Sequence, residues 1–161
     1  MLFRSEKWDQ RWYMGLFQIS NEPGFLTPTL YNYVGRPDKT AEVVRKTLKE
    51  RYNTTKEGIP GNDDSGSMSS WYVFHALGFY PNTGQDLYLI SSPTFEEAVI
   101  HLENGRDLSI KAKKASDKNI YVQSVKLNGE PLDACSFKHT DIANGGDRKS
   151  TRLNSSHSAV S

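Results

Sequence analysis

The sequence Gly61-Asn62-Asp63-Asp64-Ser65-Gly66-Ser67-Met68-Ser69-Ser70-Trp71, followed by Leu77-Gly78-Phe79-Tyr80-Pro81, carries most of the information about this chain. Two adjacent carboxylates lie on a loop bounded by glycines, and an apolar, aromatic segment follows directly. The apolar residues recur at helical spacing and Gly78 and Pro81 end the pattern, so a helix is predicted from about Met68 to Leu77. Such a loop presents acidic groups at the mouth of a cavity, while the helix behind it is anchored in a core.

Further helical signals precede this loop. Asn21-Glu22-Pro23-Gly24 is a turn signal, and it interrupts a pattern in which Trp8, Trp12, Tyr13 and Phe17 are spaced as one face of a helix. We expect a helix before this turn, a short aromatic helix over residues 25–33, and an amphipathic helix that Asp38 or Thr40 caps and that ends at about Tyr52.

The pattern changes after Pro81. Apolar and polar residues alternate with period two in several segments, and turn-forming residues separate these segments. Asn128-Gly129 predicts a type I′ hairpin turn. Helices followed by strands at this spacing indicate the α+β class, with an antiparallel β segment after the helices. The predicted strands cover residues 86–90, 97–102, 108–112 and 121–127.

Composition excludes several classes of function. Hydrophobic residues make up 36% and charged residues 24% of the 161 residues, which fits a protein with a modest core. The formal net charge of +1 argues against a nucleic-acid surface. The longest mostly apolar run, residues 71–80, has about half the length of a membrane span. We therefore expect neither nucleic acid nor a membrane as a partner.

The end of the chain differs from the rest. Residues 147–161 are polar and have no hydrophobic period, which is typical of a disordered tail. Residues 147–157 also look like the in-frame translation of a sequencing adapter. We therefore expect a helical region over residues 1–82, a β-rich region over 83–146, and a disordered, adapter-derived tail over 147–161. An artefactual 3′ end suggests an incomplete 5′ end, so we interpret the chain as a fragment.

The residue types alone leave alternatives open for the acids. Asp63 or Asp64 can simply N-cap the helix that follows, or the pair can polarise a water molecule and hold a hydroxyl group or an ion. Glu22 precedes Pro23, whose ring stiffens the backbone and suits the presentation of an oxygen to a hard cation. Glu22 can equally be a loop acid that caps the next helix.

Aromatic residues after the acidic loop also have two interpretations. They can stack against a sugar ring, but aromatic residues at helical spacing more often belong to a core. The residues concerned are Trp71, Tyr72, Phe74 and Phe79.

The stretch over residues 61–81 resembles the signature of the glycoside hydrolase family 92 α-mannosidases. In that family an N-terminal β-sandwich precedes an (α/α)6 barrel. The resemblance implies that the helical region is the last few helices of the barrel and that the β-rich region follows them. Further segments match family landmarks in the same order: Asn21-Glu22-Pro23, Leu30-Tyr31-Asn32-Tyr33, Gly35-Arg36-Pro37 and Phe137-Lys138-His139-Thr140-Asp141-Ile142.

Members of this family are calcium-dependent, inverting exo-α-mannosidases, so the resemblance implies a fragment of such an enzyme, with mannose-containing glycans as substrates. It implies that Asp64 is the general base and that Asp63 orients water or substrate. It also implies that Asn21 and Asn62 contact the mannose and that Glu22 is a calcium ligand. Many relatives carry an acid at the position of Asn62, and this departure lowers the local negative charge.

The resemblance places the second carboxyl group upstream of residue 1. Inverting hydrolysis needs that group on the other side of the scissile bond, where it protonates the leaving oxygen. The fragment alone is therefore expected to be inactive, and the activity is expected in the full-length parent.

Two other functions stay open. The β segment with its aromatic helices can form a non-catalytic carbohydrate-binding module, or the chain can be the product of a non-functional gene fragment. An upstream reading frame that encodes a helical barrel favours the enzyme, whereas a start codon at Met1 favours the binding module. We expect a secreted or extracellular parent, and only then does the glycosylation sequon Asn53-Thr54-Thr55, on a predicted loop, become relevant.

Overall fold

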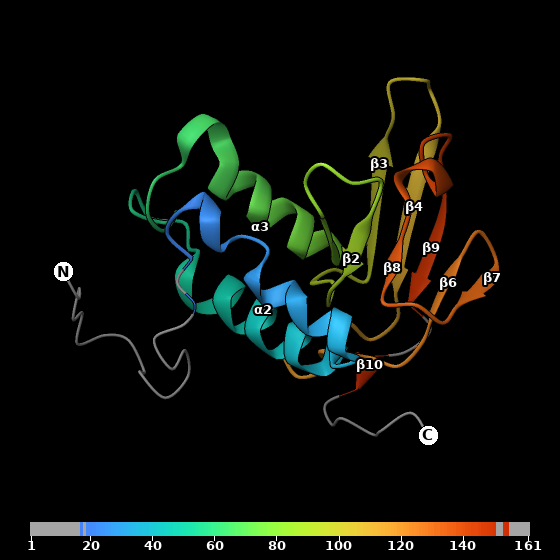
Figure 1. The fold of residues 1–161 in the computed structure, drawn as a ribbon, viewed down its shortest axis with the longest axis horizontal. Helices are drawn as coiled ribbons and strands as arrows, with labels where there is room; N and C mark the ends of the chain where they lie inside the picture. Colours follow the sequence, from blue (N-terminus) through green and yellow to red (C-terminus); the bar gives the residue numbers. More distant parts are fainter. Residues whose placement is uncertain (1–16, 18, 151–152, 155–161) are drawn as a thin grey trace.

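The computed structural model describes residues 17, 19–150 and 153–154. It has the predicted α+β architecture, with α2 and α3 on one side and the larger sheet on the other (Figure 1). None of the helices in these residues is long and apolar enough to cross a membrane. The predicted helix with Trp8 and Trp12 lies outside the described residues. The helical elements are η1 (Glu22–Gly24), η2 (Thr27–Val34), α2 (Pro37–Arg51), η3 (Asp64–Gly66), α3 (Ser67–Leu77) and η4 (His139–Asp141).

Helix α2 follows the predicted amphipathic pattern but begins differently. Pro37 occupies its first turn, where a missing N–H costs nothing and the fixed φ suits a helix. Arg36 precedes it at the capping position, which neither Asp38 nor Thr40 therefore occupies. The Asp38 carboxylate accepts hydrogen bonds of 2.9 and 2.7 Å from the Arg36 guanidinium, and the Thr40 hydroxyl donates to the Pro28 carbonyl over 3.0 Å. The predicted cap was therefore wrong. Asp38 and Thr40 use their side chains for these other hydrogen bonds, which the sequence pattern does not reveal.

Helix α3 ends where the sequence predicts. Gly78 adopts a left-handed conformation with φ 91°, and its N–H donates to the carbonyls of Phe74 and His75. Strand β1 (Phe79–Pro81) begins at the next residue. It pairs antiparallel with β2 (Tyr88–Ile90), and β2 pairs antiparallel with β8 (Ser136–Phe137). The boundary expected near residue 82 therefore falls inside the β1–β2 hairpin.

The larger sheet has the strand order β3-β4-β9-β6-β7. Asn128 and Gly129, with φ 52° and 90°, form the turn between β6 and β7, which confirms the predicted hairpin. The single strand predicted over residues 121–127 is two strands, because β5 pairs with β10 and β6 joins the larger sheet. The strands are β3 (Glu97–His101), β4 (Asp107–Ala112), β5 (Tyr121–Val122), β6 (Val125–Leu127), β7 (Glu130–Leu132), β9 (Gly146–Ser150) and β10 (Leu153–Asn154).

The structure differs from the predicted disordered tail at residues 147–150 and 153–154. Strand β9 lies in the middle of the larger sheet, parallel to β4 and antiparallel to β6. The β segment is therefore mixed and not purely antiparallel. The sequence pattern missed this strand because ladder hydrogen bonds come from the backbone, which a polar segment supplies as well as an apolar one. The adapter origin of the tail stays a prediction.

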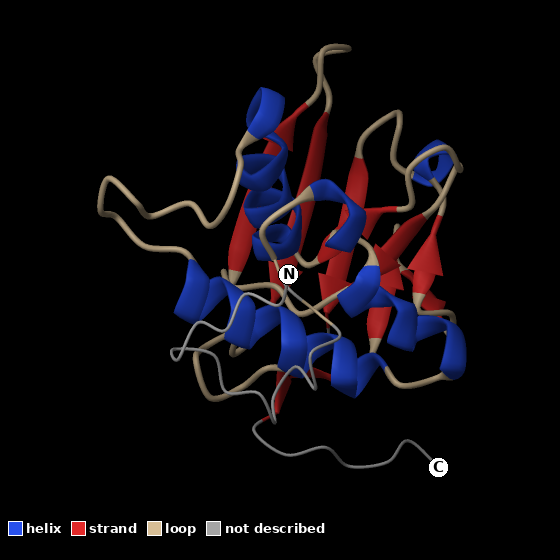
Figure 2. Ribbon diagram, turned by 60° about the vertical axis from the view of Figure 1, so that its left-hand side comes forward, coloured by secondary structure: helices blue, strands red, loops and turns tan. Residues whose placement is uncertain are grey.

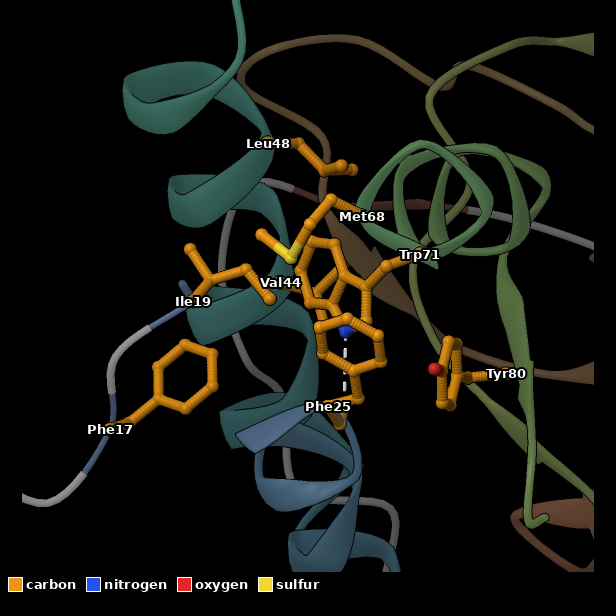
Figure 3. Close-up of a cluster of buried hydrophobic side chains, with 8 residues drawn as sticks. All are labelled: Phe17, Ile19, Phe25, Val44, Leu48, Met68, Trp71 and Tyr80. Carbon is orange, nitrogen blue, oxygen red and sulfur yellow. Dashed lines mark hydrogen bonds between the residues drawn. The ribbon is translucent and has the colours of Figure 1, made fainter. Parts of the chain in front are cut away.

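The first core lies between α2, α3 and the segment before η2 (Figure 3). Trp71 is fully buried at its centre, and its indole N–H donates to the Phe25 carbonyl over 3.0 Å. Tyr80 of β1 packs against the Trp71 ring, with 6.5 Å between the ring centroids. Burial of Trp71 confirms its interpretation as a core residue. The cluster consists of Phe17, Ile19, Phe25, Val44, Leu48, Met68, Trp71 and Tyr80.

A second core lies under the sheets. Phe79 is 2% exposed and packs edge-on against Phe137 of β8, with 5.5 Å between the ring centroids. Phe79 and Tyr80 are neighbours in β1, so the alternation of a strand sends them into different cores. Phe74 of α3 packs against both clusters. The second cluster consists of Phe79, Ile90, Leu108, Ile110, Val125, Phe137 and Ile142.

Two buried polar side chains join the helical part to the strands and to the loops between them. The Asn32 amide nitrogen donates to the carbonyls of Ile90 (2.7 Å) and Cys135 (3.2 Å), next to strands β2 and β8. The Arg45 guanidinium donates to the carbonyls of Pro93 (2.6 Å) and Ser116 (2.7 Å). Because buried donors without partners are costly, these bonds fix how the two parts meet.

His75 is a buried base in α3. Its side chain has no exposed surface, its ring stacks on Tyr80 at 4.8 Å, and its Nδ1 lies 3.2 Å from the Ser91 hydroxyl. Nε2 has no hydrogen-bond partner among the described residues. Desolvation lowers the pKa of His75 from 6.5 to about 3. The folded state therefore holds His75 neutral at a pH where the unfolded chain protonates it.

This burial predicts a loss of stability in mild acid. Above the unfolded pKa of 6.5, His75 is neutral in both states and the protein keeps its full stability. As the pH drops from there toward about 3, only the unfolded chain gains a proton on His75, so the folded state becomes less stable relative to it. We expect the free energy of unfolding to fall by up to about 1.4 kcal/mol per pH unit within this window. Urea unfolding at a series of pH values measures this slope. His75→Gln should remove this part of the slope, and an unchanged slope in that variant would contradict the assignment.

Candidate active site

The acidic loop is held against the segment before η1. The Asn62 N–H donates to the Ser20 carbonyl over 3.3 Å. Gly61 has φ 70°, and a β-carbon there would clash with the backbone of Ser20. Only glycine therefore permits this approach of the two backbones. Two segments that are far apart in the sequence become neighbours in this way.

Asp63 caps helix α3. One carboxylate oxygen accepts the Ser69 N–H over 2.9 Å, and the other accepts the Ser69 hydroxyl over 2.8 Å. Ser69 lies in the first turn of α3, so Asp63 satisfies an N–H that has no partner inside the helix. The same hydrogen bonds, with the backbone bond the larger effect, lower the pKa of Asp63. The capping alternative is therefore observed for Asp63.

Asp64 is different from its neighbour. It is the first residue of η3 and is exposed, and its carboxylate makes no hydrogen bond to the described residues. Ser65 and Gly66, with φ 53° and 76°, follow it in the left-handed region before α3 begins. Ser65 is a non-glycine residue in a strained conformation, a feature that often occurs at functional sites. These two left-handed residues separate Asp64 from the capping interaction that holds Asp63.

Glu22 lies at the same end of α3. Its carboxylate accepts the hydroxyl of Ser67, the first residue of α3, over 2.7 Å. This hydrogen bond is the main cause that lowers the pKa of Glu22, so the carboxylate stays ionised in weak acid. Asn21 is exposed and precedes η1 in an extended conformation. Its side chain makes no hydrogen bond to the described part of the chain.

The structure therefore brings two distant segments together at one helix end. The links are the Ser20–Asn62 backbone bond and the Glu22–Ser67 side-chain bond. Ser67 and Ser69 were not among the predicted site residues. Serine in the first turn of a predicted helix is a signal for capping, but the sequence does not say which acid it meets. The segments that meet are residues 20–22 and 61–69.

The oxygen atoms at this site meet the needs of a calcium ion only in part. Glu22 offers an ionised carboxylate, which suits a hard cation, but calcium takes about six to eight oxygen ligands. Among the described residues, no group of three or more His, Cys, Asp or Glu side chains is placed to hold a metal ion. These residues can therefore supply one acidic ligand and not a complete calcium shell.

Other candidate features lie elsewhere. Trp71 and Phe79 are buried, so they cannot stack on a sugar in this structure, whereas Tyr72 is exposed. A groove of about 500 Å³ runs beside α2, and Tyr72 is one of its lining residues. The groove contains none of the predicted acids or asparagines. It is lined by acids and bases together, and Lys49 and Asp117 at its edge form an ion pair of 2.8 Å.

Comparisons with known proteins point to glycosidases. The profile described as "Glycosyl hydrolase family 92 catalytic domain" matches residues 1–151. A protein of Arthroderma benhamiae named "Uncharacterized secreted glycosidase" is 39% identical over 134 residues, which are 81% of this chain and 17% of that protein.

Solved structures give the same result. A GH92 α-mannosidase from Bacteroides thetaiotaomicron, in complex with mannoimidazole, has a TM-score of 0.84 and 32% identity over 88% of this chain and 19% of its own. A GH92 inverting mannosidase from the same species has a TM-score of 0.80 and 31% identity over 91% of this chain and 20% of its own. The chain thus spans about a fifth of the length of these relatives. Because the family profile matches nearly the whole chain, the chain belongs to glycosyl hydrolase family 92.

Proposed function

We propose that this chain is part of a calcium-dependent, inverting exo-α-mannosidase that hydrolyses terminal α-mannosides of glycans. The observation that carries the proposal is the meeting of residues 20–22 with residues 61–69 at the start of α3, in a chain of family 92. Two solved relatives are named as mannosidases, and one of them was solved with mannoimidazole. The fungal relative is named as secreted, which favours an extracellular parent.

The helical part is proposed to be the last helices of an (α/α)6 barrel, with the β part after it. Support comes from the length of the relatives, which leaves room for the rest of such a barrel. A single catalytic-domain profile covers both parts of the chain. The second core also continues from α3 into the sheets through Phe74. These observations favour part of a catalytic domain over a separate carbohydrate-binding module.

Asp64 is proposed as the general base. In an inverting reaction a carboxylate removes a proton from water while the water oxygen attacks the anomeric carbon, and an acid about 6.5–9.5 Å from the base protonates the leaving oxygen. Asp64 suits the first role because its carboxylate is exposed and is not engaged by the described residues. Asp63 is proposed to orient water or substrate indirectly, since its two oxygens hold Ser69. Asn21 and Asn62 are proposed to bind mannose hydroxyl groups.

Replacement of Asp64 tests this assignment in the full-length protein. A general base typically contributes about 10²–10⁴-fold to the rate, so Asp64→Asn should lower kcat at least about 100-fold and leave the melting temperature almost unchanged. Asp63→Asn is the matched control. It should lower the melting temperature, because it weakens the cap of α3, and should reduce kcat less. A normal kcat in Asp64→Asn with a complete loss in Asp63→Asn would reverse the two roles.

Calcium is proposed to bind beside Glu22 and to be needed for activity. A chelator should remove activity from the full-length protein, and added calcium should restore it, because a hard cation suits carboxylate and sugar hydroxyl oxygens. Glu22→Gln should raise the calcium concentration that gives half-maximal activity. Activity that survives exhaustive chelation would contradict the metal, and an unchanged calcium response in Glu22→Gln would contradict the residue.

The chain over residues 1–161 should not hydrolyse mannosides by itself. The reaction needs a second carboxyl group that acts as acid, and we expect that group in the part of the catalytic domain that this chain does not span. Release of the aryl group from an aryl α-mannoside by the purified chain measures this directly. Turnover that Asp64→Asn abolishes would show that the chain already contains a complete site.

A further inference from the structure

Asn53 lies in the loop that joins α2 to η3, and Figure 2 shows this loop standing out from the body of the protein. Asn53 and the residues up to Glu57 are exposed. Asn53-Thr54-Thr55 has the N-x-T pattern of an N-glycosylation acceptor, without proline in the middle position. The proposed hydrolysis does not use this motif.

The loop forms a closed turn around Asn53. Its N–H donates to the Gly58 carbonyl over 3.0 Å, and the Gly58 N–H donates to the Thr55 carbonyl over 3.0 Å. A β-carbon at Gly58 would clash with the Asn53 carbonyl group, so only glycine closes the turn in this way. The position of Asn53 is therefore fixed by the backbone of its own loop.

The two ends of the Asn53 carboxamide have different surroundings. Its oxygen accepts the Thr55 N–H over 2.9 Å and the Thr55 hydroxyl over 2.6 Å. Its nitrogen, Nδ2, makes no hydrogen bond to any residue that the structure describes. A substituent on Nδ2 therefore leaves every hydrogen bond of the turn in place. Because Asn53 is exposed, a large polar substituent also displaces no packed side chain.

We propose that Asn53 is the acceptor of an N-linked oligosaccharide. The donor class is a polyprenyl diphosphate-linked oligosaccharide. Nδ2 bonds to the anomeric carbon of the first sugar, the bond from that carbon to the diphosphate oxygen breaks, and Nδ2 loses one proton as the lipid diphosphate leaves. The proposal requires passage of the chain through a compartment that holds the transferase, and it does not depend on the proposed hydrolysis.

A second acceptor pattern, the N-x-S sequence Asn154-Ser155-Ser156, provides an internal comparison. Asn154 belongs to strand β10, where its backbone pairs with Tyr121 of β5. Asn53 has no such strand partner, because it lies in a loop. Peptide mapping separates the two positions, so a glycan on one is not mistaken for a glycan on the other.

The experiment uses the full chain, directed into the secretory pathway of a eukaryotic expression host by a cleavable leader. We expect a glycan on Asn53 that peptide N-glycosidase F removes, leaving aspartate in its place in the peptide mass spectrum. The total cell extract is analysed, because transfer precedes secretion and a retained chain still reports it. Cleavage of the leader, read from the N-terminal peptide, selects the molecules that entered the compartment.

Three variants separate the motif from its surroundings. Thr55→Ala should abolish the glycan at Asn53, because the motif requires a hydroxyl group at this position. Thr55→Ser keeps a hydroxyl group and should keep the glycan. Thr54→Ala, at the free middle position, should keep it. An unmodified Asn53 in molecules whose leader has been cleaved would overturn the proposal, and so would a glycan at Asn53 that persists in Thr55→Ala.

Discussion

Gly78 ends α3 with φ 91°, and Pro93 packs so close to it that a β-carbon would lie 2.8 Å from the proline ring. The Ser91 N–H donates to the Gly78 carbonyl over 2.8 Å, so the segment after β2 is bound to the end of α3. Any other residue would combine a strained φ with a steric clash. Because β1 begins at the next residue, this turn also decides that Tyr80 enters the first core and Phe79 the second.

Helix α3 therefore connects the folded body to the candidate site. Its C-terminal end is fixed by Gly78, and its middle is fixed by the burial of Trp71 and His75. Its N-terminal end carries Ser67 and Ser69, which hold Glu22 and Asp63. Functional side chains keep their positions when the element that carries them is rigid. The buried ring of Trp71 thus helps to position the acids at the start of α3.

Much of the fold follows from local pattern. Helical spacing predicts α2 and α3, Gly78 predicts the end of α3, and Asn128-Gly129 predicts its hairpin, since each depends on residues close in sequence. The parallel pairing of β9 with β4 was not predictable, because backbone hydrogen bonds leave no mark on side-chain periodicity. In the site, the sequence indicates the acidic residues. It does not indicate that Glu22 meets Ser67, because this contact spans 45 positions and depends on how η1 and α3 come together.

Adjacent carboxylates on one loop cannot stand on opposite sides of a sugar, so Asp63 and Asp64 cannot be the acid and the base of one inverting reaction. The two residues must have different roles. The start of α3 separates these roles, because its unpaired N–H groups attract one acid as a cap. Asp63 takes that place with both of its oxygens. The left-handed residues Ser65 and Gly66 then let the chain enter the helix without using Asp64. If Asp64 capped the helix in place of Asp63, its carboxylate would be hydrogen-bonded and less available for chemistry. In the structure no described residue holds the Asp64 carboxylate.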